Sequence, residues 1–294
     1  MNVGLIDVDG HNFPNLALMK ISAWHKARGD HVEWCFPIKH YDRVYQSGVF
    51  DDTYSLDIDW IPQADEIIKG GTRYGLDNKL SDEVEHIYPD YSLYPELTTD
   101  TAYGFLTRGC PRGCKFCIVA GKEGRKSVKV ADLTEFWHGQ RNIKLLDPNL
   151  LACPDHLDLL QQLVNSRAYV DFTQGLDIRL TTDDSVALLN RMRVKRLHFA
   201  WDDPNDDLVP CFDRFAAMYR RKDRSVKIVY VLTNFGSTLD QDLYRIYTLR
   251  DLGYDPYVMI YDKPHAPRDI RRLQRWCNNR RIFRKCPDFG EYTG

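Results

Sequence analysis

The first 75 residues contain several short apolar runs of the length of a strand. Between the first two of these runs, apolar residues recur at helical spacing. Strands are expected at 3–8, 31–36, 44–50 and 66–69. A helix is expected at 14–28, and the residues predicted to share its apolar face are Leu16, Met19, Ala23 and Ala27. A strand, a helix and further strands in this order predict a mostly parallel open sheet.

The chain from 76 to 101 shows no hydrophobic period. It is polar and rich in tyrosine, and it contains Pro89 and Pro95. We interpret it as a linker that lies on the domain that follows it.

Regular alternation returns at residue 102. Strands are expected at 104–108, 143–146, 169–172, 196–200, 227–232 and 257–260. Helices are expected at 154–166, 183–192, 208–221, 239–252 and 268–281. The β/α units over 102–265 predict an α/β fold with a partial, TIM-like (β/α)6 barrel, whose active site lies at the carboxyl ends of the strands.

Composition narrows the class of protein. Aromatic residues make up 12% of the chain, which indicates a folded core, and the net charge of −2 predicts no overall attraction to nucleic acid or acidic membranes. No apolar stretch is long enough to cross a bilayer, and Asp7 and Asp9 interrupt any signal-peptide run. We therefore expect a cytoplasmic protein, in which clustered cysteines bind metal more often than they form disulfides.

Three of the eight cysteines form a C-x3-C-x2-C motif: Cys110, Cys114 and Cys117. Gly109, Pro111 and Gly113 discourage a helix there and let the backbone curl around a compact object. Three thiolates suit a thiophilic metal, and three protein ligands leave a fourth position open, as catalytic metal centres need.

This spacing, together with Phe116 before the last cysteine, resembles the signature of the radical S-adenosylmethionine (SAM) superfamily. The resemblance implies a [4Fe–4S] cluster on the three cysteines, SAM chelating the fourth iron, and Phe116 near the adenine. It further implies reductive cleavage of SAM, radical chemistry on an unidentified substrate, and a reductant such as a flavodoxin or ferredoxin.

The N-terminal 1–75 region is similar to the Rossmann-like domain of the cobalamin-binding-like branch, including its Gly70-Gly71-Thr72 segment. Related cobalamin sites use Asp-x-His-x-x-Gly. Asp9 and His11 fit that pattern, but Pro14 stands where glycine is expected. We interpret the domain as degenerate, with cobalamin and a methyl- or methylthiotransferase activity as the alternative.

A structural zinc site is the competing interpretation of the motif. Its fourth ligand would come from His11, His138, Cys153 or His198. Structural zinc sites more often use two separated C-x2-C knuckles, which this chain lacks. A non-catalytic zinc-stabilised module that binds nucleic acid is therefore the second hypothesis.

Polar residues after the barrel strands are the remaining site candidates. Where the superfamily has a Gly-Gly-Glu-like segment, this chain has Asp147 and Asn149, which either replace it as ligands of SAM or cap a helix. Arg179 either pairs with the SAM carboxylate or forms a surface ion pair. Further cofactor candidates are Asp202 and Asn234, and the substrate candidates are Tyr261 and Lys263.

The C-terminal region, 266–294, is basic. Eight Arg or Lys residues lie between Arg268 and Lys285, interleaved with Trp276 and Phe283. A phosphate-binding surface is one interpretation, and the favoured one is an amphipathic helix with an apolar face of Ile270, Leu273, Trp276 and Cys277.

Overall fold

The computed structural model describes residues 1–10 and 12–294. By its contacts the chain divides into two compact units. The first contains residues 1–104, 112–125 and 131–143, and the second contains 105–111, 126–130 and 144–294. The predicted boundaries at 75, 101 and 265 stay predictions.

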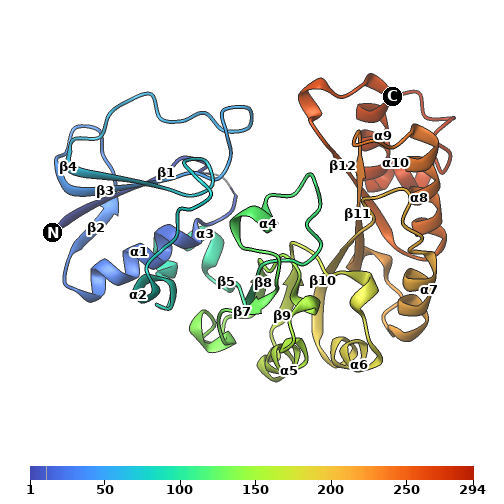
Figure 1. The fold of residues 1–294 in the computed structure, drawn as a ribbon, viewed down its shortest axis with the longest axis horizontal. Coiled ribbons are helices and arrows are strands. Elements are labelled where there is room, and N and C mark those ends of the chain that lie inside the picture. The colour runs from blue at the N-terminus through green and yellow to red at the C-terminus, as the bar shows by residue number, and fades with distance from the viewer. Residues whose placement is uncertain (11) are drawn as a thin grey trace. The chain divides into compact units, whose positions relative to one another are not determined.

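The first unit contains a four-stranded parallel sheet (Figure 1). Its strands, in the spatial order β2-β1-β3-β4, are β1 (Asn2–Asp7), β2 (His31–Trp34), β3 (Tyr41–Ser47) and β4 (Ala64–Gly70). The predicted parallel open sheet is confirmed. The carboxyl ends of β1, β3 and β4 lie together, since Val8 N–H donates to the Ser47 carbonyl and Gly48 N–H to the Gly70 carbonyl.

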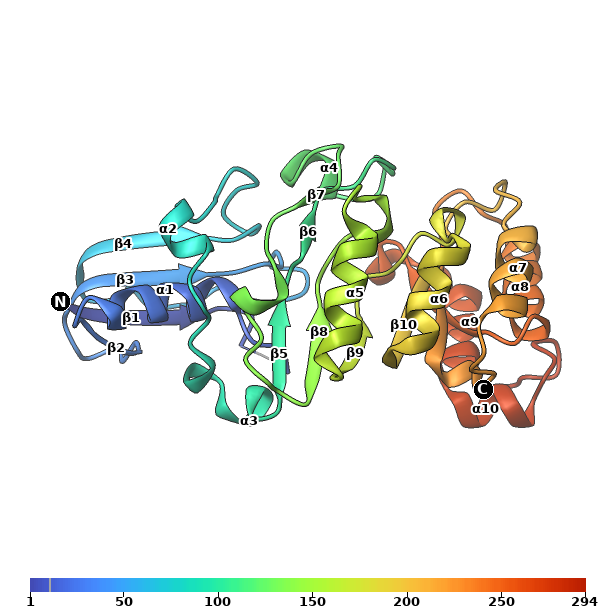
Figure 2. The ribbon, with the colours of Figure 1, turned by 90° about the horizontal axis from the view of Figure 1, so that it is seen from below.

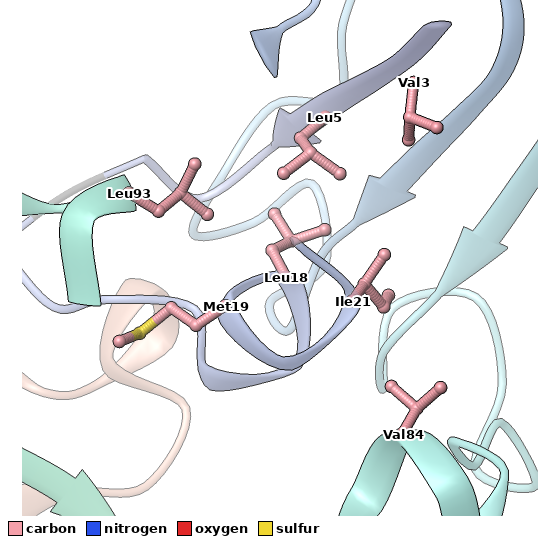
Figure 3. Packing of buried hydrophobic residues seen from close by; sticks show 7 residues of the cluster. All are labelled: Val3, Leu5, Leu18, Met19, Ile21, Val84 and Leu93. Carbon is pink, nitrogen blue, oxygen red and sulfur yellow. The ribbon is translucent and has the colours of Figure 1, made fainter. Parts of the chain in front are cut away.

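Helix α1 (Leu16–Ala27) covers one face of this sheet and builds its core. Asn15 caps the helix by accepting a hydrogen bond from Leu18 N–H at 3.2 Å. Figure 3 shows the apolar side chains that form this cluster, namely Val3, Leu5, Leu18, Met19, Ile21, Val84 and Leu93.

The predicted apolar face of α1 is correct at Leu16 and Met19, which pack in the core, and wrong at Ala27, which is exposed. Ala23 is half-buried, whereas the polar Ser22 and His25 are buried. Both polar side chains are buried because they have partners: Ser22 Oγ donates to Asp90 at 2.6 Å, and His25 Nδ1 lies 2.6 Å from Asp30. Hydropathy alone therefore does not identify the whole buried face of α1, because part of that face consists of polar side chains with hydrogen-bond partners.

The 76–101 segment contains short helices that sequence periodicity missed: α2 (Asp82–Glu85), the 3-10 turn η1 (Tyr91–Leu93) and α3 (Pro95–Thr98). Val84 and Leu93 pack into the core of α1 and β1. The expectation that this segment lies on the following domain is therefore wrong in its main contacts. A linker would not contribute buried side chains to the sheet that precedes it.

A six-stranded sheet follows, with its strands in chain order from β5 to β12. They are β5 (Thr101–Gly104), β8 (Asn142–Leu145), β9 (Tyr169–Phe172), β10 (Arg193–Ala200), β11 (Lys227–Thr233) and β12 (Asp255–Ile260). Strands β9 to β12 pair in parallel. The α/β class and the predicted strands after residue 140 are confirmed, and the partial barrel remains a prediction.

Helices of the second unit follow its strands one by one along the same side of the sheet (Figures 1 and 2). They are α5 (His156–Ser166), α6 (Asp183–Arg191), α7 (Val209–Met218) and α8 (Leu239–Asp251), with α9 (Arg268–Asn278) packed on β12 and α10 (Arg280–Lys285) after it. Right-handed crossovers between sequentially ordered parallel strands place every helix on one face.

The strand predicted at 104–108 is broken. β5 ends at Gly104, and β6 (Thr107–Arg108) instead pairs antiparallel with β7 (Val128–Lys129). The break occurs because the backbone N–H groups of Leu106 and Thr107 donate to the Asp147 carboxylate rather than to a neighbouring strand.

No helix in the described ranges is long and apolar enough to cross a membrane.

Candidate active site

The cysteine motif lies in a loop that is closed at its base by the β6–β7 ribbon. Cys110 is two residues beyond β6, and the loop includes α4 (Val119–Lys122) before it returns. Val130 N–H donates to the Leu106 carbonyl at 2.8 Å, which ties the returning leg to the outgoing one. The chain before and after the motif is therefore held by backbone hydrogen bonds.

Within the loop, Gly113 has a positive φ of 59°, and a Cβ there would lie 2.1 Å from the Arg125 guanidinium. No other residue fits this position without moving Arg125. Cys117 N–H donates to the Cys114 carbonyl at 3.0 Å, so these two cysteines lie on one tight turn.

None of the three motif cysteines is in a disulfide; Cys110 and Cys114 are half-buried and Cys117 is exposed. Phe116, between the last two, is half-buried. Across residues 1–10 and 12–294, no three His, Cys, Asp or Glu side chains already form a group that could hold a metal ion. The motif is thus described by its loop and its donor chemistry.

Helix α4 also contacts the first unit's sheet edge. Lys122 Nζ donates to Thr72 Oγ1 at 2.5 Å, and Thr72 follows the Gly70-Gly71 turn at the end of β4. The loop's distal part, 112–125, belongs to that first unit. One lysine therefore joins the cysteine loop to the Gly-Gly turn, two segments that sequence analysis treated separately.

Asp147 fixes the start of the cysteine loop. Its Oδ1 accepts hydrogen bonds from Thr107 N–H at 2.5 Å, Thr107 Oγ1 at 2.7 Å and Leu106 N–H at 3.1 Å. Complete burial raises the pKa of Asp147 to about 6, although these hydrogen bonds act in the opposite direction. The carboxylate accepts from β6 and caps no helix, so the capping alternative is wrong for Asp147.

Asn149 contacts the first cysteine directly. Its Nδ2 donates to Cys110 Sγ at 3.6 Å, while its Oδ1 is buried without a hydrogen-bond partner in the part of the chain that the structure describes. The residue is 3% exposed. It is the N-cap residue of the 3-10 turn η3 (Leu150–Ala152), but its side chain makes no cap hydrogen bond. A buried acceptor without a donor is uncommon, and it marks a place where a ligand can supply the donor.

Arg179 forms ion pairs, which is the second of its two predicted roles. Its guanidinium lies 2.7 Å from Asp177 and 2.8 Å from Asp206, and both carboxylates raise its pKa. The bond to Asp206 holds the loop after β10 against the loop after β9. SAM carboxylate binding by Arg179 would have to compete with these two acids.

The other predicted residues lie at the carboxyl ends of β10, β11 and β12. Asp202 follows Trp201 after β10, and its carbonyl accepts from Arg245 at 2.9 Å. Asn234 has a positive φ of 62° and donates to the Tyr261 carbonyl at 2.8 Å, which links the ends of β11 and β12. Tyr261 is exposed against Phe235, and Lys263 is exposed at the start of the 3-10 turn η6 (Lys263–His265).

A buried arginine that sequence analysis missed holds these strand ends together. Arg245 of α8 is 1% exposed and donates to the carbonyls of Trp201, Asp202 and Leu232 at 2.6 to 2.9 Å. Asp242, one turn earlier, lies 2.5 Å away and is fully buried. Its only signal in the sequence is an acid–base pair at helical spacing beside the apolar Ile246 and Leu249.

The face of the second sheet opposite the helices carries a second set of polar residues. Phe199 packs edge-to-face against Phe212 and Phe215 of α7, so the neighbouring residue His198 points to the opposite face. By strand register Tyr230 and Tyr257 share the face of His198. Tyr257 is 41% exposed, so this face is open to solvent at β12.

His198 is held in one orientation there. Its Nδ1 lies 2.9 Å from the Phe172 carbonyl and 3.7 Å from Asp171, and its ring stacks on Tyr230. A carbonyl only accepts, so Nδ1 carries the proton and Nε2 of the neutral ring is an acceptor. Burial lowers the pKa of His198, which favours the neutral ring.

No protein-family model and no curated protein match this sequence. A solved structure does: the radical S-adenosylmethionine methyltransferase TsrM from Kitasatospora setae, with cobalamin and a [4Fe–4S] cluster bound. The TM-score is 0.61 at 10% identity, over 88% of this chain and 74% of that one. The two chains share a fold. At this identity the likeness concerns the fold alone.

Proposed function

We propose that this chain is a radical SAM enzyme whose [4Fe–4S] cluster is held by Cys110, Cys114 and Cys117. The C-x3-C-x2-C motif carries the proposal. Two further observations support it: the loop follows a short strand at residues 107–108, and the chain shares the fold of a radical SAM methyltransferase. Fold similarity alone would not identify the reaction, and the motif alone would not identify the fold that surrounds it.

The donor set fits such a cluster. Three cysteine side chains stand on a glycine-containing loop, and the Asn149 amide donates to one of them, as amide hydrogen bonds to cluster ligands commonly do. When bound, the cluster and SAM would supply a 5′-deoxyadenosyl radical able to abstract hydrogen from a substrate.

We assign the SAM amino group to Asn149 rather than to Asp147. The Asp147 oxygens already accept hydrogen bonds from Leu106 and Thr107, whereas Asn149 Oδ1 has no hydrogen-bond donor among the described residues. An N–H of the SAM amino group would satisfy that buried acceptor. Phe116, Arg179, Asp202 and Asn234 stay predicted cofactor contacts, and Tyr261 and Lys263 stay predicted substrate contacts.

We place the substrate against the sheet face that carries His198, Tyr230 and Tyr257. Two tyrosine rings supply an apolar wall, with ring centroids 5.9 Å apart. His198 Nε2 offers one oriented acceptor for a substrate N–H or O–H group. Because the fold hosts many reactions, the substrate itself is to be found by experiment.

Anaerobic reconstitution tests the proposal. Protein supplied with iron, sulfide, SAM and dithionite should form 5′-deoxyadenosine, and Cys110→Ala should abolish both the cluster absorbance and the product. Cys211→Ala, a half-buried cysteine outside the motif, is the matched control and should retain both. A colourless protein containing one zinc and inert toward SAM would instead establish the zinc-stabilised module.

A cobalamin-dependent methyltransferase is the second candidate, because the structural neighbour was determined with cobalamin bound. The carboxyl edge of the first sheet is tightly built: a Cβ on Gly71 would lie 2.2 Å from the Gly48 carbonyl oxygen, and Arg73 packs on Gly48. His11, the predicted cobalt ligand, lies outside the described residues. Titration with hydroxocobalamin decides, since binding through histidine shifts the corrin absorption, and a methylated product would follow.

A further inference from the structure

The basic C-terminal segment, Arg268–Lys285, is a firmly anchored pair of helices. The apolar side chains predicted for α9 are buried, and the helix packs on β12. Asn278 secures it, because its Oδ1 accepts from Val258 N–H at 2.8 Å and its Nδ2 donates to the Val258 carbonyl at 3.1 Å. Trp276 Nε1 donates to the Cys286 carbonyl at 2.8 Å, which ties α9 to the end of α10. The predicted amphipathic helix is confirmed.

Charge is concentrated in this segment to an unusual degree. It holds eight basic residues and one acid, Asp269, for a formal charge of +7. Since the whole chain carries −2, the other residues together carry −9. The net charge of the whole chain is near neutral, and for that reason it predicted no binding to polyanions. It is the sum of a strongly basic C-terminal segment and an acidic remainder.

Most of these cations form no ion pair with another described residue. Arg272 stacks over Phe289 at 4.7 Å, and Arg280 pairs with Asp255 at 2.6 Å. Six other side chains are exposed and form no ion pair within residues 1–10 and 12–294, namely Arg268, Arg271, Arg275, Arg281, Arg284 and Lys285.

Several basic side chains on other helices form ion pairs with acidic residues. Lys20 and Lys26 of α1 pair with Glu85 and Asp90 at 2.9 and 2.6 Å, and Arg214 of α7 pairs with Asp183 at 2.5 Å. On α9 and α10, like charges three and four residues apart disfavour each helix by about 0.2–0.5 kcal/mol per pair. An external polyanion would remove that repulsion.

We propose that the exposed face of α9 and α10 binds the phosphodiester backbone of a nucleic acid. Seven of the eight basic residues are arginines, whose planar forks match phosphate oxygens. Arg268, Arg271 and Arg275 follow one another at helical spacing, about 4.5 and 6 Å apart along the axis. They form a row on a rigid support, so little entropy is lost when phosphates bind.

A lipid surface fits this element less well. An interfacial helix inserts its apolar face among acyl chains, but Ile270, Leu273 and Trp276 are buried within the protein. Only the charged face is available, and it carries no exposed large apolar residue. The inference concerns these helices alone and does not depend on the proposed cluster chemistry.

Fluorescence anisotropy tests the proposal on the full chain. The probes are a fluorescein-labelled 30-nucleotide single-stranded RNA and the DNA of the same sequence, titrated at several KCl concentrations from 50 to 300 mM. The patch variant is Arg271→Gln/Arg275→Gln/Arg284→Gln. The control variant, Arg28→Gln/Arg191→Gln/Arg214→Gln, changes the net charge equally at exposed positions on other helices.

We expect the wild type to bind at least one probe, with log affinity falling linearly against log salt. The patch variant should lose about tenfold or more in affinity at 100 mM KCl, and its salt slope should fall by about 2, because three phosphate contacts are removed. The control should change less than about twofold. Glutamine preserves helix propensity, and circular dichroism checks that both variants fold.

Equal losses in the two variants, or no binding to either probe at 50 mM KCl, would overturn the proposal. Binding to phosphatidylserine-containing vesicles but to neither probe, lost in the patch variant, would assign the face to membranes and also overturn it. Formation of 5′-deoxyadenosine in the same preparations reports on the proposed enzyme separately, so failure of one proposal is distinguishable from failure of the other.

Discussion

Replacing Asp147 with asparagine should change how the free energy of unfolding depends on pH. The carboxylate is 4% exposed and accepts three hydrogen bonds on Oδ1, from Leu106 and Thr107. Asparagine keeps a carbonyl oxygen for these donors but cannot ionise. The variant therefore separates the free-energy cost of burying the charge from the effect of losing the hydrogen bonds to Leu106 and Thr107.

The expected magnitude follows from the pKa. Burial raises the pKa of Asp147 from 3.8 to about 6, which corresponds to about 3 kcal/mol. The folded protein binds this proton more tightly than the unfolded chain does. The stabilisation is thus fully present below pH 3.8, is lost as the pH rises to about 6, and changes no further above it.

Urea unfolding of the wild type and of Asp147→Asn, each from pH 4 to pH 7.5 under identical anaerobic conditions, measures the effect. The stability of the wild type relative to the variant should fall by about 3 kcal/mol between pH 4 and pH 7. Thr107→Val removes a donor that lowers this pKa, so its own loss of stability with rising pH should be steeper than that of the wild type. A difference between wild type and Asp147→Asn that is flat, or that grows with pH, would refute the reasoning.

Arg245→Met should destabilise the protein by about 3–5 kcal/mol in thermal or urea unfolding, because Asp242 is left charged and buried, and the double variant with Asp242→Asn should recover part of the loss. Cys110→Ser should lower the iron content after reconstitution to background while Cys211→Ser leaves it unchanged, as measured by colorimetric iron analysis. His198→Gln should gain stability relative to the wild type as the pH falls through 6.5. Burial lowers the pKa of His198, so the folded wild type resists protonation and loses stability as the pH falls. Urea unfolding from pH 5 to pH 8 measures this, and a difference between the two proteins that does not change with pH would contradict it.

Much of the fold was predictable because its strands are local apolar runs between turn residues. The strand at 169–172 was predicted at its observed bounds, and the helix at 183–192 within one residue. The same pattern failed at 104–108, where extended residues leave the sheet to donate to Asp147, some forty positions later in the chain. Local hydropathy carries no information about that distant acceptor.

The candidate site divides in the same way. Spacing alone singled out the cysteines, because ligands of one metal centre are often close in sequence. The orphaned oxygen of Asn149 and the three carbonyls held by Arg245 depend on contacts between loops far apart in the chain. Arg179 shows what the sequence cannot decide. Its neighbours in the sequence are compatible both with a ligand of SAM and with an ion pair, and the contact with Asp206, in the loop after the next strand, shows the ion pair.

The sequential order of the second sheet has a consequence for engineering. Each β/α repeat supplies alternate residues to two surfaces, one packed under helices and one free of them. Positions such as Tyr230, Tyr257 and Met259 can be randomised together without changing a side chain in the helix-covered core. The scaffold is therefore suited to combinatorial libraries in which neighbouring strands contribute variable positions to one face, and new selectivity could be sought without rebuilding the helix-covered core.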